Sequence, residues 1–407
     1  MRVKGSSRAV AVVVTAGVMV LAACSSSSKA SSSASGSPAA SPTTASTSGP
    51  PIKVLAVTQP LTATDATNGL KMAEAYINAN GGVKGRPLSI ILCSDNNDPN
   101  TAATCVRDGI SQGAVAEIDR MSAYGATMDP LEQAAGMVTL GGGMFSQADF
   151  AASNMFPLNA GLFNSIGSAP LAVKLLGAKT LGAPHLNTPA AAALPALLKT
   201  VCATIGCSVV GSVAIATTAA DITPQVAAEV QAKPDVVING LTVDAYVKLI
   251  KGMQQQGSSA KFEVSSGIMD ASRVSQYLGA SVQNIYVTSQ DDYQSAGYQQ
   301  FLAACKQFCP DPSNLTGHVI WAWEAALLFK TVAESATSID AKGIAAAAAQ
   351  VTNFTIGNII PPVNFSTPST AFGGKAPRLF NDTMWIYEFK DGQLLPLGGG
   401  TGVKTLG

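Results

Sequence analysis

Strand-like and helix-like stretches alternate along most of this 407-residue chain. The first strand-like stretch, 52–57, is rich in apolar and β-branched residues, as is typical of a strand buried on both faces of a sheet. A helix-like stretch follows at 69–79, and Gly81-Gly82 ends it because glycine readily adopts the positive φ found after a helix. This order predicts an α/β fold with parallel sheets covered by helices.

The expected elements fall into two series. In the first, strands are expected at 52–57, 88–93, 114–118 and 137–140, and helices at 69–79, from 99 onward and at 128–135. In the second, strands are expected at 179–183, 209–214, 236–239, 261–264 and 285–288, and helices near 190–204, 224–232 and 243–256. Helices at 318–335 and 340–351 follow, and then a hairpin in which Asp391-Gly392 joins strands at 385–390 and 393–397. Two series, in a chain too long for one ordinary core, predict two lobes with a cleft between them.

The N-terminus has the pattern of a bacterial lipoprotein signal. Arg2, Lys4 and Arg8 precede an apolar run at 9–23 that is shorter than the roughly 20 residues needed to span a bilayer. The run ends in Leu21-Ala22-Ala23-Cys24, a lipobox. We therefore expect a signal peptide at 1–23 and lipidation (palmitate) of Cys24, which would anchor the protein at the extracytoplasmic face of the cell membrane. An uncleaved membrane anchor and a plain signal peptide remain alternatives.

Residues 24–51 are almost entirely Ser, Ala, Thr, Pro and Gly after the cysteine. A segment of this composition buries too little apolar surface to offset its ordering entropy, so we expect a disordered tether with a reach on the order of 30 Å.

Charge and cysteine content narrow the function classes. The mature chain has 22 basic against 25 acidic residues once Arg2, Lys4 and Arg8 are removed, and it shows no basic stripe, so no nucleic-acid partner is expected. Seven cysteines become six after lipidation of Cys24, and an even number in an exported chain suggests disulfides. Six cysteines allow fifteen pairings, of which the spacing favours three local ones: Cys93–Cys105, Cys202–Cys207 and Cys305–Cys309.

Enzymatic chemistry has little support in the sequence. No cysteine pair has C-x-x-C spacing and His185 and His318 are the only histidines, so no metal site and no cofactor are expected. There is no H-E-x-x-H motif, and two histidines provide little acid–base machinery. We expect no enzyme, although a carboxylate-only hydrolase stays as an alternative.

Four segments together resemble a known family. They are 78–86 (N-A-N-G-G-V-K-G-R), 89–104 with its acidic D-x-x-x-D-P loop, 234–238 (P-D-V-V-I) and 252–262. In order and spacing they resemble the leucine/isoleucine/valine-binding family of type I periplasmic binding proteins, which serve ABC importers. The resemblance covers nearly all of 52–390.

The resemblance implies two doubly wound, Rossmann-like lobes joined by three crossover strands near residues 165, 290 and 360. Lobe 1 would comprise 52–164 plus about 291–358, and lobe 2 would comprise 165–290 plus about 359–407. A small molecule would bind between the lobes at the carboxyl ends of the strands.

The resemblance also implies which loops touch that ligand. In lobe 1 they are 121–126 and 141–146, and in lobe 2 they are 185–188, 241–242 and 265–270. The implied ligand-binding residues are Ser122, Tyr124, Gly125, Gly142, Gly143, Phe145, His185, Asn187, Thr242 and Asp270. This chain departs from the family at Gly125 and Met144, where Ser and Thr are frequent, and at Gly267, where an acidic residue is common.

Each of these residues also has an ordinary structural role to be weighed. The three glycines at 141–143 suit a tight turn, Tyr124 and Phe145 suit packing, and His185 suits a surface loop. Asp270 suits the N-cap of a helix at 271–278, as Asp98 does before Pro99. Trp321 and Trp323 fall on opposite faces of one helix, so one of them is expected in the core.

The expected function is that of a lipid-anchored, extracytoplasmic solute-binding protein. It would capture an amino acid or a related small amide or acid, and deliver it to an ABC permease in the membrane. A ligand-sensing regulatory lipoprotein on the same fold is the alternative, and an anchored hydrolase is a weaker one.

Overall fold

The computed structural model describes residues 47–161, 163–188 and 191–405. The predicted signal peptide, Cys24 and nearly all of the tether lie outside these residues. Within the described ranges, no helix has both the length and the apolar character needed to cross a bilayer.

The first sheet is parallel, and its strand order is β2-β1-β3-β4-β5. Its strands are β1 (Ile52–Thr58), β2 (Leu88–Ser94), β3 (Glu117–Ile118), β4 (Thr139–Leu140) and β5 (Met155–Phe156). Its helices are α1 (Ala63–Ala79), α2 (Pro99–Ser111), α3 (Gly125–Ala135), α9 (Ala296–Phe308), α10 (Gly317–Ser335) and α11 (Ala341–Ala348). The predicted order of elements is confirmed, although α1 begins earlier than expected and β3 and β4 are shorter.

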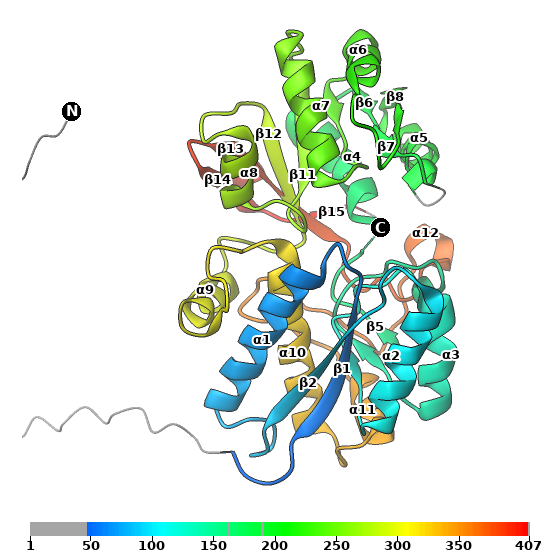
Figure 1. Cartoon of the computed structure of the whole chain (residues 1–407), viewed down its shortest axis with the longest axis vertical. Helices are drawn as coiled ribbons and strands as arrows, with labels where there is room; N and C mark the ends of the chain where they lie inside the picture. Colours follow the sequence, from blue (N-terminus) through cyan, green and yellow to red (C-terminus); the bar gives the residue numbers. More distant parts are fainter. Residues whose placement is uncertain (1–46, 162, 189–190, 406–407) are drawn as a thin grey trace, which may run out of the picture. The chain divides into compact units, whose positions relative to one another are not determined.

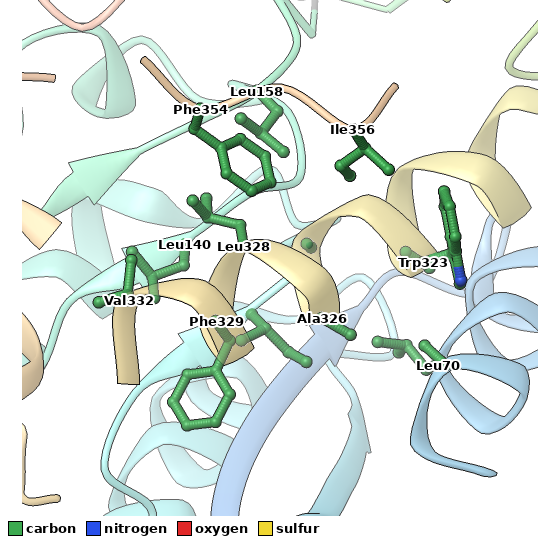
Figure 2. Close-up of a cluster of buried hydrophobic side chains, with 14 of the residues drawn as sticks. Leu70, Leu140, Leu158, Trp323, Ala326, Leu328, Phe329, Val332, Phe354 and Ile356 are labelled. Carbon is green, nitrogen blue, oxygen red and sulfur yellow. The ribbon is translucent and has the colours of Figure 1, made fainter. Parts of the chain in front are cut away.

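Helix α10 is the centre of the first core. Its apolar residues point in several directions, so neighbours surround it, as expected for a helix that is hydrophobic all round. Figure 2 shows Leu328, Phe329 and Val332 of this helix among Leu140 of β4 and Phe354 of a later segment. Helix α1 packs along it (Figure 1).

The close approach of α1 to α10 depends on a glycine. A Cβ at Gly69 would lie only 2.8 Å from the Cβ of Ala322, so no larger residue fits there without moving a helix. Trp323 is fully buried in this core, which confirms that one of the two tryptophans is a core residue.

The second sheet has the order β14-β13-β12-β11-β10-β6-β8, with β15 paired to β13. Its parallel strands are β6 (Thr180–Gly182), β8 (Ser208–Gly211), β10 (Val236–Val237), β11 (Lys261–Ser265) and β12 (Ile285–Ser289). Its antiparallel strands are β13 (Thr383–Lys390), β14 (Gln393–Pro396) and β15 (Val403–Lys404). A separate pair is formed by β7 (His185–Leu186) and β9 (Ala214–Ile215). The helices of this part are α4 (Phe163–Leu176), α5 (Leu194–Ile205), α6 (Thr223–Ala232), α7 (Val243–Gln255), α8 (Ala271–Leu278) and the short α12 (Ala371–Gly374).

The terminal hairpin and the cysteine pairing agree with the sequence. Asp391 and Gly392 both have positive φ, at 50° and 80°, and Lys390 faces Gln393 across the turn. The three local disulfides, Cys93–Cys105, Cys202–Cys207 and Cys305–Cys309, are all present.

The chain passes between the two sheets three times, and side-chain amides tie the passages together. Gln290 Oε1 accepts a hydrogen bond from the Ala160 N–H at 2.6 Å, and its Nε2 donates to the Asn381 carbonyl at 3.1 Å. Asn381 Nδ2 in turn donates to the Leu158 carbonyl at 3.1 Å. All three passages are therefore held at one point.

The third passage lies later in the chain than the sequence suggests. Ile359, Ile360 and Phe365 pack into the first core, and the chain enters the second sheet only at Thr383. The exact division of the chain between lobes stays a prediction.

Replacing Gln290 with leucine should lower the free energy of unfolding by about 1–3 kcal/mol for each polar group left unpaired. The Ala160 N–H and the Asn381 carbonyl would stay buried without partners. Urea unfolding measures the loss, and Gln294→Leu, at an exposed position of the same segment, is the control. An equal loss in both variants would contradict a special role for Gln290.

Candidate functional site

The loops after β3 and β4 meet at the carboxyl edge of the first sheet, because parallel strands end on the same side. Met121, beyond the end of β3, pairs with Thr58 at the end of β1, and Gly143 pairs with Asn159. Six of the predicted ligand-binding residues lie in these two loops: Ser122, Tyr124, Gly125, Gly142, Gly143 and Phe145. The structure therefore brings this half of the predicted site together.

Ser122 uses its hydroxyl hydrogen inside the protein. Its Oγ donates to Asp95 Oδ2 at 2.7 Å, and it accepts from the Tyr124 N–H at 3.2 Å. Both Ser122 and Asp95 are fully buried. The side chain of Tyr124 is partly exposed beside them.

Beneath these loops, four carboxylates surround the guanidinium group of a fully buried arginine. Arg120 Nε donates to Glu117 at 2.8 Å and Nη1 donates to Asp129 at 2.5 Å. Its Nη2 binds Glu132, and Asp149 lies 3.6 Å from Nη1. We call these five residues the Arg120 cluster. Burial raises the pKa of Glu117 well above its usual value, and it raises the pKa of Asp149 to about 6 although Arg120 opposes the shift.

Asp149 also organises the second loop. Its Oδ2 accepts from the N–H groups of Phe145 at 3.0 Å and Ser146 at 2.8 Å. Ser146 Oγ accepts from the Ala148 N–H at 3.2 Å, at the start of a short 3₁₀ helix. A Cβ at Gly125 would overlap Asp149 Oδ1, so glycine at 125 leaves the space that the carboxylate fills.

The three glycines make a tight turn. Gly141 and Gly142 have φ values of 71° and 65°, which favour glycine. A Cβ at Gly143 would lie 2.8 Å from the Phe145 ring. The turn is thus required for packing, and contact of Gly142 or Gly143 with a ligand stays a prediction.

In the second part of the predicted site, Asp270 is the N-cap of α8. Its Oδ1 accepts from the Arg273 N–H at 2.8 Å, and its Oδ2 accepts from the Leu315 N–H at 2.9 Å. At Gly267, a Cβ would lie 3.0 Å from His318 Nε2 and 3.2 Å from the Trp321 ring. The two rings of α10 therefore cover Gly267, the position where the family commonly has an acidic residue. Burial lowers the pKa of His318 to about 4, so this ring is uncharged at neutral pH.

The remaining predicted residues are less connected. His185 is buried, with Nδ1 3.1 Å from the Ala183 carbonyl, so the surface-loop alternative is wrong. Asn187 is exposed, and Thr242 is half-buried before α7. Their contact with a ligand stays a prediction.

Two contacts join the helices of the first sheet to segments of the second, and no sequence pattern indicates them. Trp321 packs with Met121 and Phe145 of the first loops as well as covering Gly267. Arg273 of α8 forms a two-pronged ion pair with Asp65 of α1, at 2.6 and 2.9 Å, although the residues are 208 positions apart. Burial opposes ionisation of Asp65, but hydrogen bonds from Arg273 and Asn314 outweigh it and lower its pKa.

A second group of buried acids lies where the chain passes between sheets. Asp291 Oδ2 accepts from Trp321 Nε1 at 3.1 Å and from Ser289 Oγ at 3.3 Å. Burial raises the pKa of Asp291 to about 7, and it raises those of Glu324 and Asp119 well above their usual values. Among the described residues, no group of three or more His, Cys, Asp or Glu side chains could hold a metal ion.

A G-x-S-x-G sequence, which in hydrolases can carry the nucleophile, occurs at 109–113. It lies at the end of α2 and not in a strand-to-helix elbow, and Ser111 Oγ donates to the Asp108 carbonyl at 2.9 Å. This serine is therefore not arranged as a hydrolase nucleophile.

Replacing Arg120 with methionine should lower the free energy of unfolding by about 3–5 kcal/mol, because several buried carboxylates would lose their only cation. Chemical unfolding at pH 7 measures this loss. Arg107→Met, at an exposed position of α2, is the matched control and should change little. A stable Arg120→Met protein would show that the acids are held neutral without the guanidinium.

Asp291 should make the protein less stable as the pH rises. The folded carboxyl keeps its proton up to about pH 7, whereas the unfolded one loses it near its usual pKa of 3.8. The folded state then binds more protons between these values, so the free energy of unfolding falls across this window. Asp291→Asn should flatten the fall in urea unfolding between pH 5 and 8, while Asp244→Asn, at an exposed site, should follow the unmodified chain. Parallel curves for all three proteins would contradict the shift.

Comparisons with known proteins agree with this architecture. A family model described as periplasmic binding protein matches residues 57–393. None of the curated proteins matches the chain.

Several solved structures share the fold. A substrate-binding periplasmic protein from Ralstonia solanacearum aligns with a TM-score of 0.71 and 14% identity, over 85% of this chain and 99% of that one. A fatty acid ABC transporter substrate-binding protein from Thermomonospora curvata aligns at 0.68 and 16%, over 88% and 92%. The branched-chain amino acid transporter substrate-binding protein LivJ from Streptococcus pneumoniae, in complex with isoleucine, aligns at 0.68 and 15%, over 87% and 100%. With its parallel first sheet, its mixed second sheet and three passages between them, the chain belongs to the periplasmic binding protein family and has the type I fold.

Proposed function

We propose that this protein is a lipid-anchored, extracytoplasmic receptor that captures a small organic molecule between its lobes and delivers it to an ABC importer. Family membership supports the capture of a small ligand. The lipobox at Cys24 and the tether support the anchor. A folded domain on a flexible tether could reach a permease in the same membrane.

The observation that carries the proposal is the contact of α10 with predicted ligand loops of both sheets. Trp321 packs against Met121 and Phe145 on one side and covers Gly267 on the other. The carboxyl edges of the two sheets are thus joined through a wall of aromatic and apolar side chains. Ligands of open α/β sheets bind at these edges.

Closure would be controlled by a few contacts. The Asp65–Arg273 pair joins α1 to α8, and the Gln290 hydrogen bonds hold the passages together. A ligand that contacts both lobes would stabilise the closed state by its differential affinity. The membrane partner would read the spacing of the lobes.

A ligand-sensing lipoprotein would use the same closure, so the alternative concerns the partner and not the site. Capture of a small molecule is common to both functions. Loss of solute uptake on deletion of the gene would favour transport, and loss of a transcriptional response with normal uptake would favour sensing.

Capture should be visible in a thermal-shift screen of the intact chain against amino acids, amides, short organic acids and sugars. A ligand at about 100 times its dissociation constant adds roughly 2.7 kcal/mol of stability. Tyr124→Ala should weaken the hit by about 10- to 100-fold, because a buried aromatic side chain contributes roughly 1.5–3 kcal/mol. Tyr76→Ala, in the C-terminal half of α1, should bind normally. Equal binding by both variants would remove Tyr124 from the site.

A further inference from the structure

At the carboxyl edge of the first sheet, the chain's own carboxylates accept hydrogen bonds from three donors of the predicted ligand loops. Hydroxyl groups and backbone N–H groups at the ends of parallel strands are ordinary anion-binding groups. Here the Ser122 hydroxyl and the Phe145 and Ser146 N–H groups are already bound to Asp95 and Asp149. We propose that Asp95 and Asp149 exclude carboxylates from this edge and that the captured molecule is uncharged. This inference rests on the proposed function.

The first loop gives its donor to Asp95. Ser122 Oγ is 2.7 Å from Asp95 Oδ2, and a carboxylate can only accept, so the hydroxyl hydrogen points to Asp95. The other oxygen, Asp95 Oδ1, accepts from the Asn97 N–H at 2.8 Å. Asp95 and Ser122 are fully buried, and the hydroxyl has no hydrogen left to donate to a ligand carboxylate.

The second loop gives its donors to Asp149. The N–H groups of Phe145 and Ser146 both bind Asp149 Oδ2, and Gly125 leaves room for Oδ1. The nearby guanidinium of Arg120 is already surrounded by four carboxylates. It therefore has no uncompensated positive charge to offer to a fifth.

The predicted ligand loop 265–270 of the second sheet has no free carboxylate to pair with a ligand cation. Both oxygens of Asp270 accept from backbone N–H groups, and Asp65 is paired with Arg273. At Gly267 a neutral His318 and Trp321 fill the space. A charged group would lose its hydration without gaining a charged partner, which is unfavourable.

The surface that remains at these loops is apolar or neutral. Tyr124 and Phe145 are partly exposed, and Leu61, in the loop after β1, is 67% exposed. These side chains suit the alkyl or aromatic part of a molecule whose polar group is an amide or a hydroxyl. The chemical class is thus a small uncharged amide or alcohol.

The inference is tested with pairs of compounds that share a skeleton, such as isovalerate with isovaleramide and benzoate with benzamide. The intact chain should bind the better amide at least tenfold more tightly than its acid, by thermal shift and by tryptophan fluorescence at constant ionic strength. Acids that bind as tightly as their amides would overturn the inference while supporting solute capture.

A pair of variants tests the mechanism of exclusion separately. Asp149→Ala exposes the Phe145 and Ser146 N–H groups, so its affinity for the matched acid or for acetate should rise at least tenfold. Asp149→Asn keeps an oxygen on the same N–H groups and should show no such gain. No gain in a folded Asp149→Ala protein, checked by circular dichroism, would overturn the exclusion even if amides bind. A gain in Asp149→Ala without amide binding to the unmodified chain would support the exclusion and count against the proposed function.

Discussion

The buried guanidinium of Arg120 is the interaction on which the predicted ligand edge depends. It lies under the loops after β3 and β4, and its partners come from β3, α3 and the short helix that follows β4. Two of the loops that carry candidate ligand residues are therefore fixed to one charged group. Buried charges of this kind stabilise little by themselves, but the arrangement fails when one partner is removed. Its contribution is to specify where each loop lies.

The Arg120 cluster and the acids near Asp291 share one consequence. Both place more carboxylates in the interior than there are cations to match them, so burial favours the protonated forms. Asp291 lies beside Gln290, which holds the three passages together. Asp291 also accepts a hydrogen bond from Trp321, and Trp321 packs against the predicted ligand loops after β3 and β4. Proton content, loop position and the joint between the sheets are therefore connected through a small number of buried side chains.

The sequence predicts the features that depend on neighbouring residues. The order of strands and helices, the Asp391-Gly392 turn, the local disulfides and the caps at Asp98 and Asp270 all follow from short-range chemistry. The starts of β3 and β4 do not, because pairing begins only at Glu117 and Thr139, three and two residues later than expected, although both strands end where expected. The Asp65–Arg273 pair and the partners of Trp321 join distant segments, and no spacing in the sequence indicates them.

The departures from the family pattern at Gly125 and Gly267 have a common physical basis. Each glycine leaves space that a residue from another segment fills: Asp149 against Gly125, and His318 with Trp321 against Gly267. A larger side chain restored at either position would clash with its neighbour unless that neighbour changed as well. The two glycines therefore belong to altered sets of contacts and are not isolated losses of a binding group. The first change brings a carboxylate to a position where a hydroxyl is frequent in the family, and the second brings uncharged rings to a position where an acidic residue is common.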